Sequence, residues 1–127
     1  MTTFLDTLAD IENRYDELEQ LMADPTITAD HLPAGTRYGP DLFALFGGLA
    51  PAPAAGYGFG LGFAVRTAEG RSPVPGNLGD HFWTGAYGSY FWVDPKEELF
   101  AVLMLQGPSD RFRYRYALRQ LVYGALE

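Results

Sequence analysis

Two histidines are the side chains of this chain best suited to acid–base or metal chemistry near neutral pH. His31 follows Asp30 and His81 follows Asp80, so each imidazole has an adjacent carboxylate. Zinc binds imidazole and carboxylate groups, and it lowers the pKa of a bound water to about 7. The sequence therefore offers one candidate set of ligands for a divalent metal, with zinc as the expected ion: His31, His81, Asp80 and Asp30.

The spacing leaves a structural alternative open for both histidines, because neither H-x-H nor H-E-x-x-H occurs in the chain. In that alternative His81 packs as a semi-polar aromatic beside Trp83, and His31 is a solvated loop residue. In a strand over residues 80–86, alternation places His81 and Trp83 on one face and Asp80 on the other. This arrangement would separate Asp80 from His81.

The composition predicts a single globular domain over residues 1–127. Of the 127 residues 47% are hydrophobic, enough for a small core, and no cysteine is present, which excludes disulfides and thiolate zinc sites. The net charge of −7 argues against a nucleic-acid partner. No apolar run approaches the roughly 20 residues that span a bilayer. We expect a cytoplasmic protein that acts on a small molecule and not at a membrane.

Residues 1–24 differ from the rest of the chain, since they contain seven acidic residues, one base and no glycine or proline. Thr3 and Asp6 fit a capping box, and the helical pattern ends at Pro25. The spacing of three and four between large apolar residues predicts a helix over residues 3–23. Its apolar stripe consists of Phe4, Leu8, Ile11, Tyr15, Leu18 and Met22. Such a stripe fits either a coiled-coil seam or packing on a sheet.

The middle of the chain changes from loop to β-structure. Residues 25–55 are rich in proline, which predicts a surface connection with a short helical turn near residues 41–46. In residues 56–67 glycine alternates with large apolar residues, which leaves one face of a strand bare for the close approach of a backbone or ligand. The sheet, within residues 56–106, is expected to be an antiparallel meander of four strands: residues 56–67, 80–86, 88–93 and 99–106.

A second helix is expected over residues 109–126, with Ser109 as its N-cap. Its apolar face would contain Tyr114, Ala117, Leu118, Leu121, Val122 and Ala125, and its bases are Arg111, Arg113, Arg115 and Arg119. An acidic first helix and a basic last helix, each with an apolar face, are expected to pack side by side. The predicted fold class is α+β, a four-stranded antiparallel sheet with both helices on one face.

Three segments carry a resemblance to a known family: GYGFGLGFAV, GDHFWTGAYGSYFWVDPKEELFAVLMLQ and the terminal LVYGAL. With them, residues from about 31 to 127 resemble the C-terminal portion of the serine β-lactamase-like hydrolases, which include class C β-lactamases and family VIII esterases. The family's third motif, Lys-Thr-Gly or Trp-x-Gly, matches Trp83-Thr84-Gly85. The resemblance implies a fragment of that fold, and it implies that the backbone N–H of Ala86 is an oxyanion donor.

The motifs that supply the family's nucleophile and base are absent. Ser-x-x-Lys does not occur, and neither does Tyr-x-Asn. Serine β-lactamase chemistry is therefore excluded, and hydrolysis must use another nucleophile such as an activated water. The sequence predicts a small promiscuous hydrolase of activated esters or phosphotriesters, metal-assisted, on a truncated β-lactamase-like scaffold. The alternative is a noncatalytic, self-associating fragment of a serine hydrolase.

The candidate catalytic residues are His81, Trp83 and Ala86. An apolar pocket for the substrate would be lined by aromatic residues around the glycine-rich strand, namely Tyr57, Phe59, Trp83 and Tyr87.

The stretch FLDTLADIENRYDELEQLMADP resembles the N-terminal helix of bacterial class I peptide chain release factors, although the Gly-Gly-Gln tripeptide of those proteins is absent. A truncated sheet would leave residues 99–106, LFAVLMLQ, as an open apolar edge. This predicts a homodimer or higher assembly that covers the edge or the apolar floor of the former cleft. A third possibility is an interaction module that uses an exposed acidic helix.

Overall fold

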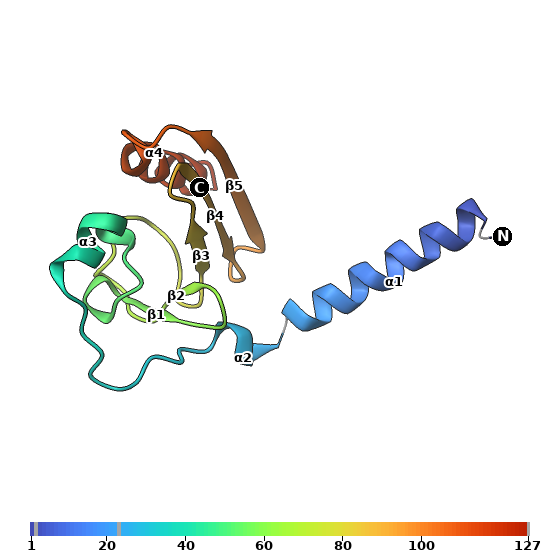
Figure 1. Ribbon diagram of the computed structural model, residues 1–127, viewed down its shortest axis with the longest axis horizontal. Helices are drawn as coiled ribbons and strands as arrows, with labels where there is room; N and C mark the ends of the chain where they lie inside the picture. Colours follow the sequence, from blue (N-terminus) through green and yellow to red (C-terminus); the bar gives the residue numbers. More distant parts are fainter. Residues whose placement is uncertain (2, 23, 127) are drawn as a thin grey trace.

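The chain forms an antiparallel sheet with one helix packed on it, and a second long helix extends away from the sheet (Figure 1). The computed structural model describes Met1, residues 3–22 and residues 24–126. Ala23, which the predicted first helix included, and Glu127, the last residue of the predicted domain, lie outside the described residues. The elements are α1 (Phe4–Met22), α2 (Pro25–Thr28), α3 (Pro40–Phe46), η1 (Gly47–Leu49), η2 (Pro53–Ala55), β1 (Tyr57–Phe59), β2 (Ala64–Arg66), β3 (His81–Thr84), β4 (Gly88–Asp94), β5 (Leu99–Gln106) and α4 (Arg111–Gly124).

The sheet has five strands in the order β1-β2-β3-β4-β5, and all neighbouring pairs are antiparallel. The meander order and the edge position of β5 were predicted correctly, but the count of four strands was wrong. The predicted first strand is a hairpin, because Gly62 adopts a φ of 106° and Gly60 N donates to Phe63 O at 2.8 Å. The left-handed backbone of Gly62 reverses the chain, whereas the alternation of glycine and apolar residues suggested that one strand continues through residues 56–67.

The bare face of β1 receives the segment that follows α1. A Cβ at Gly58 would overlap the carboxylate of Asp30, and one at Gly60 would overlap the carbonyl oxygen of Ile27. Asp30 Oδ1 accepts a hydrogen bond from Phe59 N at 3.0 Å, and Leu61 N donates to Ile27 O at 2.8 Å. The expectation of a close backbone approach at this strand is therefore confirmed, and the contact anchors α2 to the sheet.

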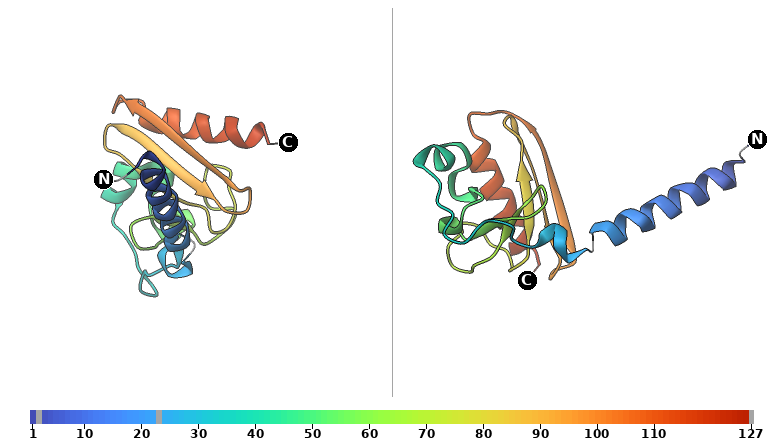
Figure 2. Two further views of the ribbon diagram at one scale, coloured as in Figure 1. Left: turned by 90° about the vertical axis from the view of Figure 1, so that its right-hand side faces the viewer. Right: turned by 60° about the horizontal axis from the view of Figure 1, so that its bottom comes forward.

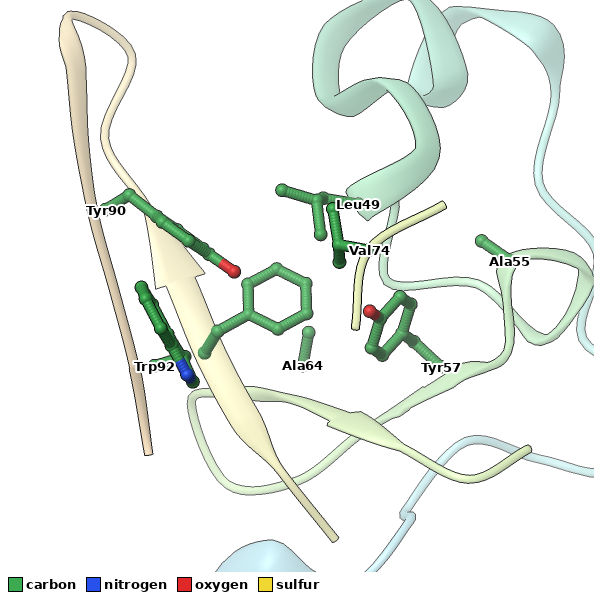
Figure 3. Close-up of a cluster of buried hydrophobic side chains, with 8 residues drawn as sticks. Leu49, Ala55, Tyr57, Ala64, Val74, Tyr90 and Trp92 are labelled. Atoms are coloured by element: carbon green, nitrogen blue, oxygen red, sulfur yellow. The ribbon is translucent and has the colours of Figure 1, made fainter. Parts of the chain in front are cut away.

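The core lies on the α4 side of the sheet, which we call the inner face. Phe82 contacts both Tyr57 of β1 and Tyr90 of β4, with ring centroids 5.0 and 5.8 Å away. Trp92 belongs to the same cluster, together with Leu49 and Val74 from the connecting segments (Figure 3). The region around η1 and η2 thus contributes core residues, with Leu49, Ala50 and Ala52 at most 2% exposed. The predicted helical turn of residues 41–46 is present as α3, but the expectation that all of residues 25–55 lie on the surface was wrong.

Helix α1 forms as predicted but does not pack where it was expected. Its capping box is present, because Thr3 N donates to Asp6 Oδ2 at 2.8 Å and Asp6 N donates to Thr3 Oγ1 at 3.2 Å. Residues 4–21 are all exposed. Two views show α1 and α4 on opposite sides of β5 (Figures 1 and 2). The predicted side-by-side packing of the two helices on one face of the sheet is therefore wrong.

Helix α4 packs on the sheet through a different face from the one predicted. Arg115 and Arg119 are 1% and 0% exposed and face the sheet together with Leu118 and Val122, whereas Leu121 is 72% exposed. The arginines occupy the interface because acceptors are available there. Of the four arginines of this basic helix, Arg113 is exposed and Arg111 is half-buried.

A buried ion cluster joins α4 to the sheet. Asp80 Oδ2 accepts hydrogen bonds from Arg66 Nε, at 2.8 Å, and from Arg119 Nη2. Arg119 also donates to Tyr90 Oη at 2.6 Å and to Pro75 O at 2.7 Å. Burial raises the pKa of the Asp80 carboxyl, and the charges of Arg119 and Arg66 oppose that shift. The cluster fixes the start of β3.

Candidate functional site

The outer face of the sheet, opposite α4, carries two of the residues that the sequence identified as candidates for chemistry, His81 and Trp83. His81 pairs with Val93, and Trp83 pairs with Phe91. Residues directly opposite each other on neighbouring strands share a face of the sheet. Phe91 and Val93 pair with Val102 and Phe100, so the same face continues onto β5. The outer face consists of His81, Trp83, Phe91, Val93, Phe100, Val102 and Met104. The predicted separation of His81 and Trp83 from Asp80 and the core residue Phe82 is confirmed.

His81 lines a hollow of about 370 Å³ at one end of this face, together with Val93 and Phe100. Two exposed carboxylic acids, Glu19 of α1 and Glu98 of the β4–β5 turn, line the same hollow. We call it the His81 hollow. The imidazole and the two carboxylic acids that line it come from three separate segments of the chain: β3, α1 and the β4–β5 turn.

The hydrogen bonding of His81 determines which nitrogen is available. Nδ1 lies 3.2 Å from the carbonyl oxygen of Gly79. A carbonyl oxygen can only accept, so Nδ1 carries the proton and the neutral ring presents its lone pair at Nε2. Such an Nδ1–H to carbonyl contact is the arrangement that orients a ligating or basic histidine. The ring also packs against Phe63, with centroids 5.7 Å apart.

The carboxylates around the hollow differ in whether they already accept hydrogen bonds from the protein. Asp94 accepts hydrogen bonds from Asn77 Nδ2 and Tyr123 Oη, and from the backbone of the β4–β5 turn. Burial alone would raise the pKa of Asp94, but these hydrogen bonds outweigh it and lower the pKa. Glu98 has a φ of 52°, a left-handed backbone that is uncommon outside glycine. Asp94 is therefore structural, while Glu19 and Glu98 have solvent-accessible carboxylates.

An apolar basin of about 500 Å³ lies farther along the outer face. It is lined by Trp83, Thr84, Gly85, Ser89, Tyr90, Phe91, Val102, Leu103 and Met104. Trp83 also contacts Phe46 and Phe59, with ring centroids 5.5 and 5.4 Å away. This basin could accept an aryl group, because it is apolar, aromatic and open to solvent.

The structure does not assemble the four predicted metal ligands. Asp80 is held by two arginines on the inner face, and Asp30 accepts from the backbone of Phe59 and Leu32. Nε2 of His31 lies 2.6 Å from the Thr26 carbonyl oxygen, away from His81 in the α2 junction. Within the described part of the chain, no three His, Asp or Glu side chains are arranged to hold a metal ion.

The predicted substrate-binding residues separate into different environments. Trp83 lines the basin, and Phe59 contacts Trp83 but is not itself among the lining residues. Tyr57 is instead fully buried in the core, where its hydroxyl lies 2.7 Å from Ser72 Oγ. Tyr87 is 67% exposed in the β3–β4 turn and is not among the residues that line the basin. Only part of the predicted aromatic pocket is therefore formed.

Ala86, the predicted oxyanion donor, is exposed in the turn that follows β3. Sequence reasoning missed the residue that holds this turn. Arg115 donates to the carbonyl oxygens of Gly85, at 2.6 Å, and of Gly88 and Ser89, both at 3.3 Å. Burial lowers the pKa of Arg115, and the charge of Arg111 adds to that effect. The turn that contains Ala86 is thus rigidly supported by α4.

Part of the chain is similar to two mycobacterial proteins. No family model matches the chain. A 58-residue part, 43% of this chain, is 41% identical to "Protein Rv1367c" of Mycobacterium tuberculosis strain H37Rv and to "Uncharacterized protein MT1414" of strain CDC 1551. The match covers 14% of the length of each relative. In the described residues, no helix has both the length and the apolar character needed to cross a membrane.

Proposed function

We propose that the chain is a small hydrolase of activated esters or phosphotriesters, with its site on the outer face of the sheet. The observation that carries this proposal is His81, whose Nδ1 is held by the Gly79 carbonyl oxygen and whose side chain lines a hollow that also contains two exposed carboxylic acids. The adjacent apolar basin would hold the substrate's aryl group. The resemblance of residues 31–127 to β-lactamase-like hydrolases supports the reaction class but supplies no nucleophile.

The site fits activated substrates better than ordinary ones. Nε2 of His81 can take a proton from water as the water oxygen attacks a carbonyl carbon or a phosphorus atom. A leaving group of low pKa departs as an anion, so no general acid is required for its release. This requirement for a good leaving group accounts for promiscuity toward aryl esters and phosphotriesters.

A divalent metal remains part of the proposal, with zinc as the expected ion. The donor types fit, because one neutral imidazole and two carboxylates are ligands that zinc accepts. His81 is the residue of the predicted set that would be a ligand. Glu19 and Glu98 line the same hollow, but within the described residues the three side chains are not arranged to hold an ion. When bound, the ion would lower the pKa of its water to about 7. His31, Asp30 and Asp80 of the predicted set do not line this hollow.

Hydrolysis of 4-nitrophenyl acetate and of a 4-nitrophenyl dialkyl phosphate tests the proposal. We expect His81→Gln to lower kcat/KM by about 100-fold or more, as for loss of a general base or ligand. His31→Gln is the matched control, because it changes the other histidine outside the hollow. Elemental analysis, with activity before and after chelation, tests the metal. Full activity of His81→Gln would overturn the proposal, and full activity after chelation would remove only the metal.

A noncatalytic, self-associating protein is the second candidate. Phe100, Val102 and Met104 are 74%, 56% and 83% exposed on the outer face. Contiguous exposed apolar residues of this kind mark interaction surfaces as well as ligand sites. Absence of turnover with both substrates, in protein that is folded and metal-loaded, would favour this candidate.

A further inference from the structure

Helix α4 has an uncovered apolar stripe on the side turned away from the sheet. Its residues follow at spacings of three, four and four along the helix, so they share one face. They are Tyr114, Ala117 and Leu121, followed by Ala125 at the C-cap, and we call these four residues the α4 stripe. Tyr114 is 46% exposed and Leu121 is 72% exposed. The two alanines leave room for a second helix to approach closely.

Helix α1 carries a matching stripe that no part of the described chain covers. Phe4, Leu8, Ile11, Tyr15 and Leu18 are between 39% and 78% exposed. At a rise of about 1.5 Å per residue, the 19 residues of α1 span about 28 Å and the 14 residues of α4 about 21 Å. The α1 stripe is therefore long enough to cover the α4 stripe completely.

The charges beside the two stripes are complementary. Six acidic residues and one base lie within α1, whereas α4 contains no acidic residue. Arg113 is exposed and Arg111 half-buried on α4. The outer face of the sheet is a poorer partner for α1, because its rim carries the exposed acid Glu98. Charge thus favours α4 over the larger apolar surface of the sheet.

The position of α1 directs it to another molecule. Two residues separate Met22 from Pro25, and α2 is tied to the sheet through the bond from Leu61 N to Ile27 O. From this anchor α1 extends on the opposite side of β5 from its own α4 (Figure 2). Covering its own α4 would require α1 to cross the β5 edge, whereas the α4 of a second copy can be reached without that rearrangement.

We propose that two copies of this chain form a reciprocal dimer in which the α1 of each copy packs on the α4 stripe of the other. Both contacts are the same surface pair, as a two-fold axis requires. The dimer does not depend on the proposed hydrolase activity. It leaves the outer face open, and it would fix α1 and therefore hold Glu19 beside the His81 hollow of its own chain.

Sedimentation velocity of the full chain, over micromolar concentrations, tests the dimer. We expect Ile11→Asp in α1 and Leu121→Glu in α4 each to raise the dimer dissociation constant by about 10-fold or more, since each places a charge in an apolar contact. Met104→Glu on the outer face is the matched control and should leave the constant unchanged. Circular dichroism confirms that each variant is folded.

Mixing the two variants sharpens the test. Neither variant alone can form an intact contact, but a mixed pair joins the intact α1 of the Leu121→Glu chain to the intact α4 of the Ile11→Asp chain. We expect dimer to reappear on mixing. A wild-type monomer would overturn the proposal. If only Met104→Glu dissociates the dimer, the proposal is also overturned, because the interface then lies on the outer face. If the Leu121→Glu chain stays dimeric, the proposal is overturned as well, because α1 then pairs with α1. Hydrolysis by a monomer would leave the proposed function intact.

Discussion

Hydropathy alone suggests that charged side chains are exposed and apolar ones buried, and each face of the sheet departs from this expectation. The inner face buries Arg66, Arg119 and Asp80, each at most 5% exposed, whereas the outer face exposes Phe100 and Met104. The charged groups are buried because they find one another and nearby carbonyl oxygens. The apolar groups are exposed because nothing in the described chain covers them. Burial therefore depends on available partners as much as on side-chain type.

This difference separates stability from function within one sheet. The inner face holds the molecule together through aromatic packing and an ion cluster that joins β2, β3 and α4 through one carboxylate oxygen of Asp80. The outer face contributes its half-buried residues to packing and carries an open basin and a hollow. This hollow is lined by two exposed carboxylic acids and by His81, which is itself only 6% exposed. Variants on the inner face should change stability, and variants on the outer face should change activity or association.

Removal of the Asp80 charge should give the largest loss of stability. Asp80→Asn leaves the guanidinium groups of Arg66 and Arg119 buried without a counter-ion. Breaking a buried ion pair in this way costs about 3–5 kcal/mol. Domains of this kind have a total stability of about 5–15 kcal/mol, so the variant should be partly unfolded or close to it. Urea denaturation followed by circular dichroism measures the change.

Asp110→Asn serves as the control for charge alone. Asp110 is exposed, and its side chain makes no capping hydrogen bond to α4. The control should retain nearly the stability of the unmodified chain. If Asp80→Asn also lost less than about 1 kcal/mol, the cluster would not be what holds α4 to the sheet.

The sequence predicted features that depend on local pattern. The limits of β5 were predicted at residues 99–106, because an apolar run of strand length lies between two turns. The helix of α1 followed from its spacing and capping box, and the side on which His81 lies followed from strand alternation. A stripe does not identify its partner, however, so the packing of α1 could not be read from its residues.

Features that depend on distant segments were missed. The acceptors for Arg119 come from Pro75, Asp80 and Tyr90, and an arginine on a helix is ordinarily exposed. Glu19 and Glu98 meet His81 only through the tertiary fold. The adjacent carboxylates were preferred to them because they are close in sequence, although a strand turns consecutive side chains to opposite faces.

Acid should weaken the inner face through Asp94. Hydrogen bonds lower the folded pKa of Asp94 below its ordinary value of 3.8. A lowered folded pKa means that the stabilisation is present above the unfolded value and is lost as pH falls through the folded value. Stability should therefore drop as the pH is lowered below about 3.8. Asp94→Asn should lose about 1–3 kcal/mol at neutral pH and flatten this acid limb, measured by urea midpoints from pH 7 to pH 2.

Asp41 is exposed, and the Asp41→Asn variant is the control for this pH dependence. Its carboxyl lies in the first turn of α3, away from Tyr123 and Asn77. An acid limb that is as steep in Asp94→Asn as in Asp41→Asn would assign the loss of stability to other groups.

The smallest effect is expected on the outer face, at a pair of neighbours in β5. Met104 is 83% exposed, whereas Leu103 packs against the core from the inner face of the same strand. Met104→Gln should change stability by less than about 0.5 kcal/mol, as surface substitutions do. Leu103→Asn should cost clearly more, because it places an amide against aromatic side chains. Thermal melts of the two variants measure the loss of stability at neighbouring residues that lie on opposite faces of β5. A large loss from Met104→Gln would mean that the outer face is covered in solution, and the open site would then have to lie elsewhere.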